Sequence, residues 1–276
     1  MGVRLRLANV SWARLWWAPL ALIVVLIAIA AFALRYISPD YQSVVSRLGK
    51  SVNALESSLS SGGRVRAIQY TRKATFKVPS GAQTAIITSV VTPLAGGWLV
   101  RRDDWRDRFN QALVYQERYL MYRGLFGGHV QFREIAPFFH EIFGSLGWFN
   151  DEVQSQTLSL SGNFPADPNS LLSVSQKRQS DTDGQSISPK AIPYERNIQC
   201  KPDGIVDAQS IHTSLHGARH VIACEVMSTN GAPSRKNRLV HLEEFGIFMI
   251  LESQVDRTTA EPSSSFTLES LETLGK

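Results

Sequence analysis

Three regularly spaced histidines form the pattern that most suggests chemistry in this chain. His212, His216 and His220 lie four residues apart in the stretch IHTSLHGARH. On one helix they would share a face, where neutral imidazoles bind transition metals. On one strand, neighbours would lie about 13 Å apart, too far to share an ion. Gly217 interrupts a helix and a strand-like stretch begins at His220. The three residues are therefore weak candidates for a metal site, the alternative is that they face solvent or a neighbouring strand, and we expect no cofactor.

The chain has two cysteines, Cys200 and Cys224, each flanked by strand-like residues. An even pair of this kind predicts a disulfide formed in an oxidising compartment. Bridge geometry then places the two cysteines on neighbouring strands. The alternative is two unrelated buried thiols, which are common in any compartment.

The sequence lacks the motifs that identify common enzymes. There is no Gly-x-Ser-x-Gly elbow, no phosphate-binding P-loop, no dinucleotide-binding glycine pattern and no paired-cysteine metal spacing. Glu134, His140 and Glu141 could act in acid–base chemistry, but neighbours on a helix diverge by about 100°, so they would act apart. We expect no catalytic residues, although the question of enzymatic activity stays open.

An uncharged apolar run extends over residues 15–34. Its length matches the ~20 residues that cross a bilayer, whereas a cleavable signal has a shorter core of roughly 7–15 residues. Trp12, Trp16 and Trp17 at one end of the run and Tyr36 at the other are typical of membrane interfaces. The sequence therefore predicts a transmembrane anchor at residues 15–36. The alternative is a signal peptide cleaved after a small-residue site such as Ala31-Phe32-Ala33.

Charge gives only a weak guide to orientation and excludes one class of partner. Positive residues flank the apolar run on both sides, and we place residues 1–14 in the cytoplasm because they carry three arginines and no acid.

Four arginines in residues 1–36 account for most of the formal charge of +5. The rest of the chain is nearly neutral, which gives no electrostatic case for nucleic-acid binding.

Residues 40–61 carry a short heptad pattern that predicts an amphipathic helix next to the anchor. Asp40 is a suitable N-cap, and Gly62-Gly63 would end the helix. Two interpretations stay open: the apolar residues form a seam between copies of the chain, or they pack on the chain's own domain. The seam residues are Val45, Leu48, Val52, Leu55 and Leu59.

The remaining residues predict an α+β domain over 64–256, with a possible subdomain boundary at 161–190. A basic stretch at 64–77 is expected to be the solvated face of a strand, and residues 84–91 a second strand. The spacing of apolar residues predicts helices over 105–124 and 135–143, the second within an aromatic-rich region. Long antiparallel strands are expected on either side of an Asn-Gly turn near 230. Residues 257–276 are expected to be a flexible tail.

These features favour a single-pass protein of a bacterial inner membrane with its folded domain in the periplasm. The expected role is a structural or assembly subunit of an envelope complex, acting through contacts with other envelope proteins and with itself. The main alternative is a membrane-anchored sensor or effector that binds a small ligand. A metal-dependent hydrolase built on the three histidines is the third possibility.

Overall fold

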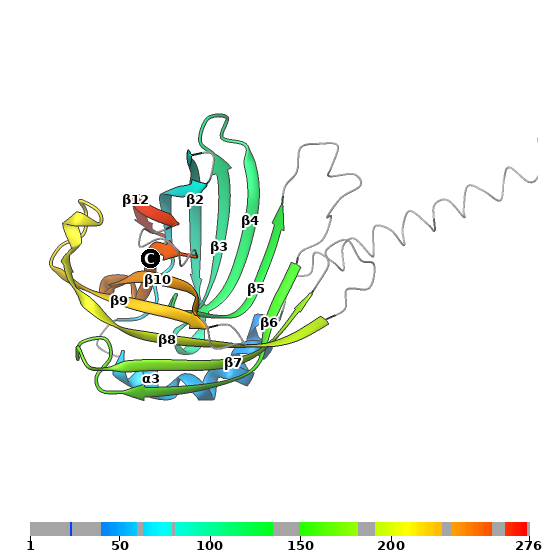
Figure 1. Cartoon of the computed structure of the whole chain (residues 1–276), viewed down its shortest axis with the longest axis vertical. Coiled ribbons are helices and arrows are strands. Elements are labelled where there is room, and N and C mark those ends of the chain that lie inside the picture. Colours follow the sequence, from blue (N-terminus) through cyan, green and yellow to red (C-terminus); the bar gives the residue numbers. More distant parts are fainter. Residues whose placement is uncertain are drawn as a thin grey trace, which may run out of the picture. The chain divides into compact units, whose positions relative to one another are not determined.

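A closed barrel of twelve antiparallel strands makes up most of the chain in the computed structural model (Figure 1). The structure describes Ile23 and residues 40–59, 63–78, 81–134, 149–181, 191–227, 233–255 and 263–274. Each strand pairs with its neighbours in the sequence, and pairing of the last strand with the first closes the ring. The strands are β1 Ile68–Val78, β2 Gly81–Pro93, β3 Trp98–Asp107, β4 Leu113–Tyr122, β5 Phe126–Glu134, β6 Phe149–Ser161, β7 Leu171–Asp181, β8 Ala191–Asp207, β9 Ala218–Met227, β10 Pro233–Leu242, β11 Ile247–Gln254 and β12 Ser264–Thr273.

The predicted α+β class is wrong, and residues 105–124 show why. They form the end of β3, a turn and strand β4 rather than a helix. Both faces of β4 are buried at its end, because Leu120 and Tyr122 belong to one hydrophobic core and Met121 to another. A strand buried on both faces loses the alternation of apolar and polar residues that identifies a strand in a sequence. Its apolar residues then matched a helical spacing by chance.

The predicted antiparallel pairing of the C-terminal strands is confirmed. The second of the two expected strands is divided by a turn into β10 and β11. β9 pairs with β10, and β10 pairs with β11 after a 3₁₀ turn at Glu243–Phe245. Residues that were expected in a flexible tail form β12, which pairs with β1 along most of its length. This strand completes the ring.

The predicted helix after Asp40 is present as a broken helical segment. It consists of α2 Tyr41–Leu48, a 3₁₀ turn η1 at Gly49–Val52 and α3 Asn53–Ser58. The Asp40 carboxylate accepts hydrogen bonds from the backbone N–H groups of Gln42 and Ser43, so it caps α2 as expected.

The apolar residues of this segment pack inside the chain. Leu48, Val52, Leu55 and Leu59 are at most 3% exposed and lie in a core that also contains side chains of the barrel, and the partly buried Val45 packs against the same core. Of the two interpretations of the heptad seam, the structure favours packing within one chain.

The prediction of a single-pass membrane protein is corrected. Among the described residues, no helix is long and apolar enough to cross a membrane. Their longest helix, α2, has 8 residues, whereas a span takes ~20. Apart from Ile23, the expected anchor at 15–36 and the tail at 1–14 lie outside the described residues. The inner-membrane location, with a cytoplasmic N-terminus and a periplasmic domain, and the membrane as a partner through one span are therefore not supported.

The turn between β4 and β5 fits tightly against β11. Gly124 has a φ of +81°, and a Cβ atom there would lie 2.2 Å from the carbonyl oxygen of Phe248. The N–H of Phe248 donates to the carbonyl oxygen of Arg123 at 2.7 Å. Only glycine combines this backbone conformation with such a close approach.

We predict that Gly124→Ala destabilises the fold much more than Gly96→Ala. Gly96 also has a positive φ, +62°, but a Cβ atom added there would meet no other atom within 4 Å. Gly96→Ala should therefore cost only the backbone strain, roughly 1–2 kcal/mol. Gly124→Ala adds the clash with Phe248 and should cost at least about 3 kcal/mol. Chemical denaturation measures both values, and equal losses would contradict the close contact.

Candidate functional site

A cavity of about 300 Å³ lies between two groups of barrel strands. Residues from β3, β4 and β5 form one side, and residues from β8, β9, β10 and β11 form the other. Figure 1 shows these groups of strands crossing each other steeply. The cavity's volume is at the lower end of the range for small-molecule sites. The lining residues are Arg101, Tyr119, Met121, Gly124, Leu125, Phe126, Gly127, Val130, Arg196, Ile198, Val226, Ser234, Arg235, Asn237, Leu239 and Ile250.

The cavity lining combines buried apolar side chains with three arginines. Phe126, Ile198 and Leu239 are among its buried apolar walls. Arg101 is 6% exposed and is the most buried of the three arginines. Arg235 is exposed and Arg196 half-buried, so these two arginines mark the mouth.

The mouth carries more positive than negative charge. Arg196 lies 4.0 Å from the carboxylate of Asp151, its nearest acidic partner. Burial, followed by the nearby charge of Arg178, lowers the pKa of Arg196, and Arg235 acts in the same direction. Among the described residues, the side chain of Arg235 has no ion-pair or hydrogen-bond partner. An anion at the mouth would therefore relieve repulsion between cations.

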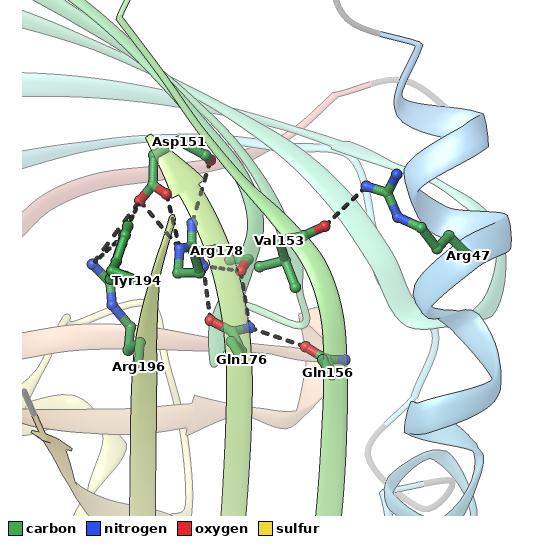
Figure 2. Close-up of polar contacts among 9 residues, drawn as sticks. Arg47, Asp151, Val153, Gln156, Gln176, Arg178, Tyr194 and Arg196 are labelled. Carbon is green, nitrogen blue, oxygen red and sulfur yellow. Dashed lines mark hydrogen bonds and ion pairs between the residues drawn. The ribbon is translucent and has the colours of Figure 1, made fainter. Parts of the chain in front are cut away.

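Asp151 is engaged mainly by Arg178, whose side chain is fully buried (Figure 2). Arg178 Nε donates to both carboxylate oxygens of Asp151, at 3.0 and 3.2 Å. The hydroxyl of Tyr194 donates to the same carboxylate at 2.7 Å and accepts from Arg196 at 3.3 Å. The network thus sets the position of Arg196 at the mouth.

The same network holds the cavity wall at Gly127. Arg178 Nη1 and Gln176 Nε2 both donate to the carbonyl oxygen of Gly127, at 2.9 and 3.1 Å. Gln176 also donates to Gln156, which donates to Ser51 of η1 (the contact between the glutamines is drawn in Figure 2). A continuous chain of hydrogen bonds therefore connects the helical segment to the cavity.

Arg101, which lines the cavity, belongs to a buried ionic cluster. Arg101 Nη2 lies 3.0 Å from the Asp103 carboxylate, and Arg72 Nη2 lies 3.4 Å from the same oxygen. Glu117 stands opposite Asp103 on β4, and burial and then the Asp103 charge raise its pKa. Arg72 was expected on a solvated face, but it is only 2% exposed.

The three predicted metal-ligand candidates do not converge. His212 contacts Ser214 and the carbonyl oxygen of Glu269, His216 contacts Gln209, and His220 belongs to β9. Within the described part of the chain, no group of three or more His, Cys, Asp or Glu residues is placed to hold a metal ion.

A disulfide joins Cys200 of β8 to Cys224 of β9. The two residues are direct partners in the register, two positions from Ile198 and Val226, which line the cavity. The bridge therefore fixes the two strands that form this side of the cavity. Disulfides of this kind persist in oxidising compartments.

Other expected features lie outside the described residues. One is the expected helix at 135–143, which includes His140 and Glu141, together with most of the aromatic residues near it. The other is residues 182–190 of the possible subdomain boundary. The first half of that boundary region contains a loop and strand β7.

Sequence analysis missed Arg101, Arg196 and Arg235. They come from strands far apart in the chain, and no motif surrounds them. Arg196 stands in a run of polar residues, ERN, where an arginine looks like an ordinary surface residue. Only the barrel brings the three together around one cavity.

Comparison with known proteins adds little to this site. No family model and no curated protein matches the chain. Among solved structures, the chain is similar to a DUF1329 family protein from Desulfovibrio piger at 10% sequence identity. The match covers 81% of this chain and 92% of that chain, with a TM-score of 0.37. A likeness this weak carries no argument about function.

We predict that Arg178→Met destabilises the barrel strongly and Arg102→Met hardly at all. Removal of Arg178 leaves the Asp151 carboxylate, 15% exposed, without its main partner, and should cost about 3–5 kcal/mol. Arg102 pairs with Asp104 at the surface and is 50% exposed, so its loss should cost less than ~1 kcal/mol. Chemical denaturation of both variants tests this, and similar small losses would show that Arg178 is not structural.

A buried histidine outside the cavity gives a pH-dependent prediction. His241 is 3% exposed and stacks on Phe248. Burial, with help from the charge of Arg123, lowers its pKa to about 4. The unfolded chain, with a histidine pKa near 6.5, then binds the proton more readily, so stability is full above pH ~6.5 and declines towards pH ~4 by about 3 kcal/mol.

The variant His241→Gln should lose less stability than the wild type between pH 6.5 and 4. Denaturant unfolding of both proteins across this range gives the comparison. Parallel profiles would mean that His241 titrates alike in the folded and unfolded states.

Proposed function

We propose that this chain is a binding protein that holds one small anionic amphiphile in the barrel cavity. The observation that carries the proposal is the combination of buried apolar walls with a mouth whose cations exceed its anions. Small-molecule sites typically have mostly apolar walls and a few convergent polar groups, and the lining of this cavity fits that description.

The charges at the mouth support an anionic head group. Arg178 and Arg196 share Asp151, and Arg235 has no described partner. Arginine suits this role because its guanidinium binds carboxylates and phosphates through two parallel hydrogen bonds. The head group would therefore lie between Arg196 and Arg235.

The walls support an apolar body behind that head group. Leu125, Phe126, Val130, Leu239 and Ile250 come from four strands or turns and line one space. Each methylene group buried against such walls contributes about 0.8 kcal/mol to binding. A short hydrocarbon chain therefore fits better than a fully polar metabolite.

The assembly role favoured by the sequence stays a prediction, and the cavity supports the ligand-binding alternative instead. In the described segment 40–59, most of the side chains offered for self-association lie in the chain's own core. They are therefore not available as an interface in this fold.

Calorimetric titration of the full chain with three ten-carbon amphiphiles tests the proposal. The probes are decanoate, decan-1-ol and decyltrimethylammonium, which differ only in head-group charge. We expect decanoate to bind about five- to tenfold more tightly than the alcohol, because it gains charge-assisted hydrogen bonds at a partly exposed site. The cation should bind least.

Substitutions at the mouth locate the binding site. Arg196→Gln and Arg235→Gln should each weaken decanoate binding and leave decanol binding unchanged. Lys236→Gln is the matched control, because Lys236 is adjacent to Arg235 but lies on the opposite face of β10 and pairs with Glu225. Equal affinity for all three probes, or no binding of any of them, would contradict the proposed function.

A further inference from the structure

We propose that the head group of the natural ligand is a phosphate monoester, which carries two negative charges, and that Arg196 and Arg235 bind it together. This inference rests on the proposed function and specifies the head group for the same cavity. A carboxylate or a phosphate diester carries one negative charge and would neutralise one of the two arginines.

Strand pairing places the two arginines on one wall of the cavity. Arg235 of β10 and Ile198 of β8 are both register partners of Val226, which lies between them on β9. Arg196 is two residues from Ile198 on β8, so it belongs to the same face of the sheet, and all four residues line the cavity. With strands about 4.8 Å apart and a rise of about 3.4 Å per residue, the backbones of the two arginines lie ~12 Å apart. Two extended arginine side chains can meet around one phosphate group across that distance.

Asp151, the acidic partner of Arg196, is already engaged by other groups. Arg178 donates to both of its carboxylate oxygens, and the Tyr194 hydroxyl donates to one of them. Arg196 lies 4.0 Å from this carboxylate and donates to the Tyr194 hydroxyl at 3.3 Å. One carboxylate therefore stands against the charges of Arg178, Arg196 and Arg235, which leaves an excess of two positive charges.

The acids that neighbour this wall face away from the cavity. Glu195 and Glu225 each directly precede a residue that lines the cavity, so their side chains belong to the opposite face of the sheet. Glu225 pairs there with Lys236 at 2.9 Å, and Glu252 of β11 lies 3.7 Å from Arg238. None of these three carboxylates is placed to pair with an arginine of the mouth.

A phosphate monoester suits a pair of guanidinium groups better than a carboxylate does. One arginine can satisfy both oxygens of a planar carboxylate through two parallel hydrogen bonds. A phosphate monoester presents three acceptor oxygens and carries roughly −1.5 to −2 charges at pH 7. Two arginines that approach from different strands can therefore each pair with it.

Calorimetric titration of the full wild-type chain at pH 8 compares decyl phosphate with decyl methyl phosphate. The two probes share the hydrocarbon chain and the tetrahedral phosphate, and they differ by one negative charge. We expect decyl phosphate to bind at least about tenfold more tightly, because it can form charge-assisted hydrogen bonds with both arginines. Equal binding of the two probes overturns this inference and leaves the proposed function standing. If neither probe binds, and decanoate does not bind either, both proposals are overturned.

Inorganic phosphate distinguishes an amphiphile from free phosphate, which has the same head-group chemistry. It should bind at least about a hundredfold more weakly than decyl phosphate, because each methylene group buried against the apolar walls adds to the affinity. Inorganic phosphate that binds as tightly as decyl phosphate would contradict both proposals.

The variant Arg235→Gln assigns the second charge. Arg235 is exposed and has no partner among the described residues, so its replacement should leave the fold intact. The advantage of decyl phosphate over its methyl ester should fall to about twofold or less, because one of the two cations is gone. Lys236→Gln is the matched control and should keep the full advantage. An undiminished advantage in Arg235→Gln would overturn the inference.

Discussion

Arg123 is the residue on which the arrangement of the barrel and its cavity depends. Its guanidinium donates to the Glu56 carboxylate of α3 and to the carbonyl oxygens of Gly63 and Gly246. Its own N–H donates to the carbonyl oxygen of Gly97, and its carbonyl oxygen accepts from Phe248 of β11. One buried side chain therefore joins the helical segment, the approach to β1 and the turn before β11. The next four residues, 124–127, line the cavity. This part of the cavity wall is thus fixed by the contacts of Arg123 with residues that do not line the cavity.

A second polar framework connects this wall to the opposite one. Arg178 and Asp151 hold Gly127 and Arg196, and the Cys200–Cys224 bridge ties β8 to β9 next to them. Both frameworks reach the helical segment, through Glu56 and through Ser51. The apolar side chains of that segment fill the adjoining core. The segment is therefore part of the fold that forms the site, and not an appendage to it.

Some of these features follow from local sequence, and others do not. The Asp40 cap, the helix after it and the pairing of β9 with β10 depend on short-range patterns and were predicted. The position of Cys200 opposite Cys224 agrees with bridge geometry. β4 was misassigned because burial of Met121 and Leu120 on opposite faces removes the strand period. The role of β12 was missed because its serines and glutamates look disordered until β1 supplies a partner. The arginines of the cavity were missed because their role depends on how deeply they are buried and on which partners they lack, and only the fold determines both.

The central claim is that the space between β3–β5 and β8–β11 binds an anionic amphiphile. The most direct test is an amide NMR spectrum of the full chain labelled with ¹⁵N at its 19 glycines, recorded with and without decanoate. Gly124 and Gly127 line the cavity, whereas Gly96, Gly204 and Gly217 do not. The account predicts that the signals of Gly124 and Gly127 shift with decanoate while the other three stay in place. Shifts at Gly204 or Gly217, with Gly124 and Gly127 unmoved, would contradict it.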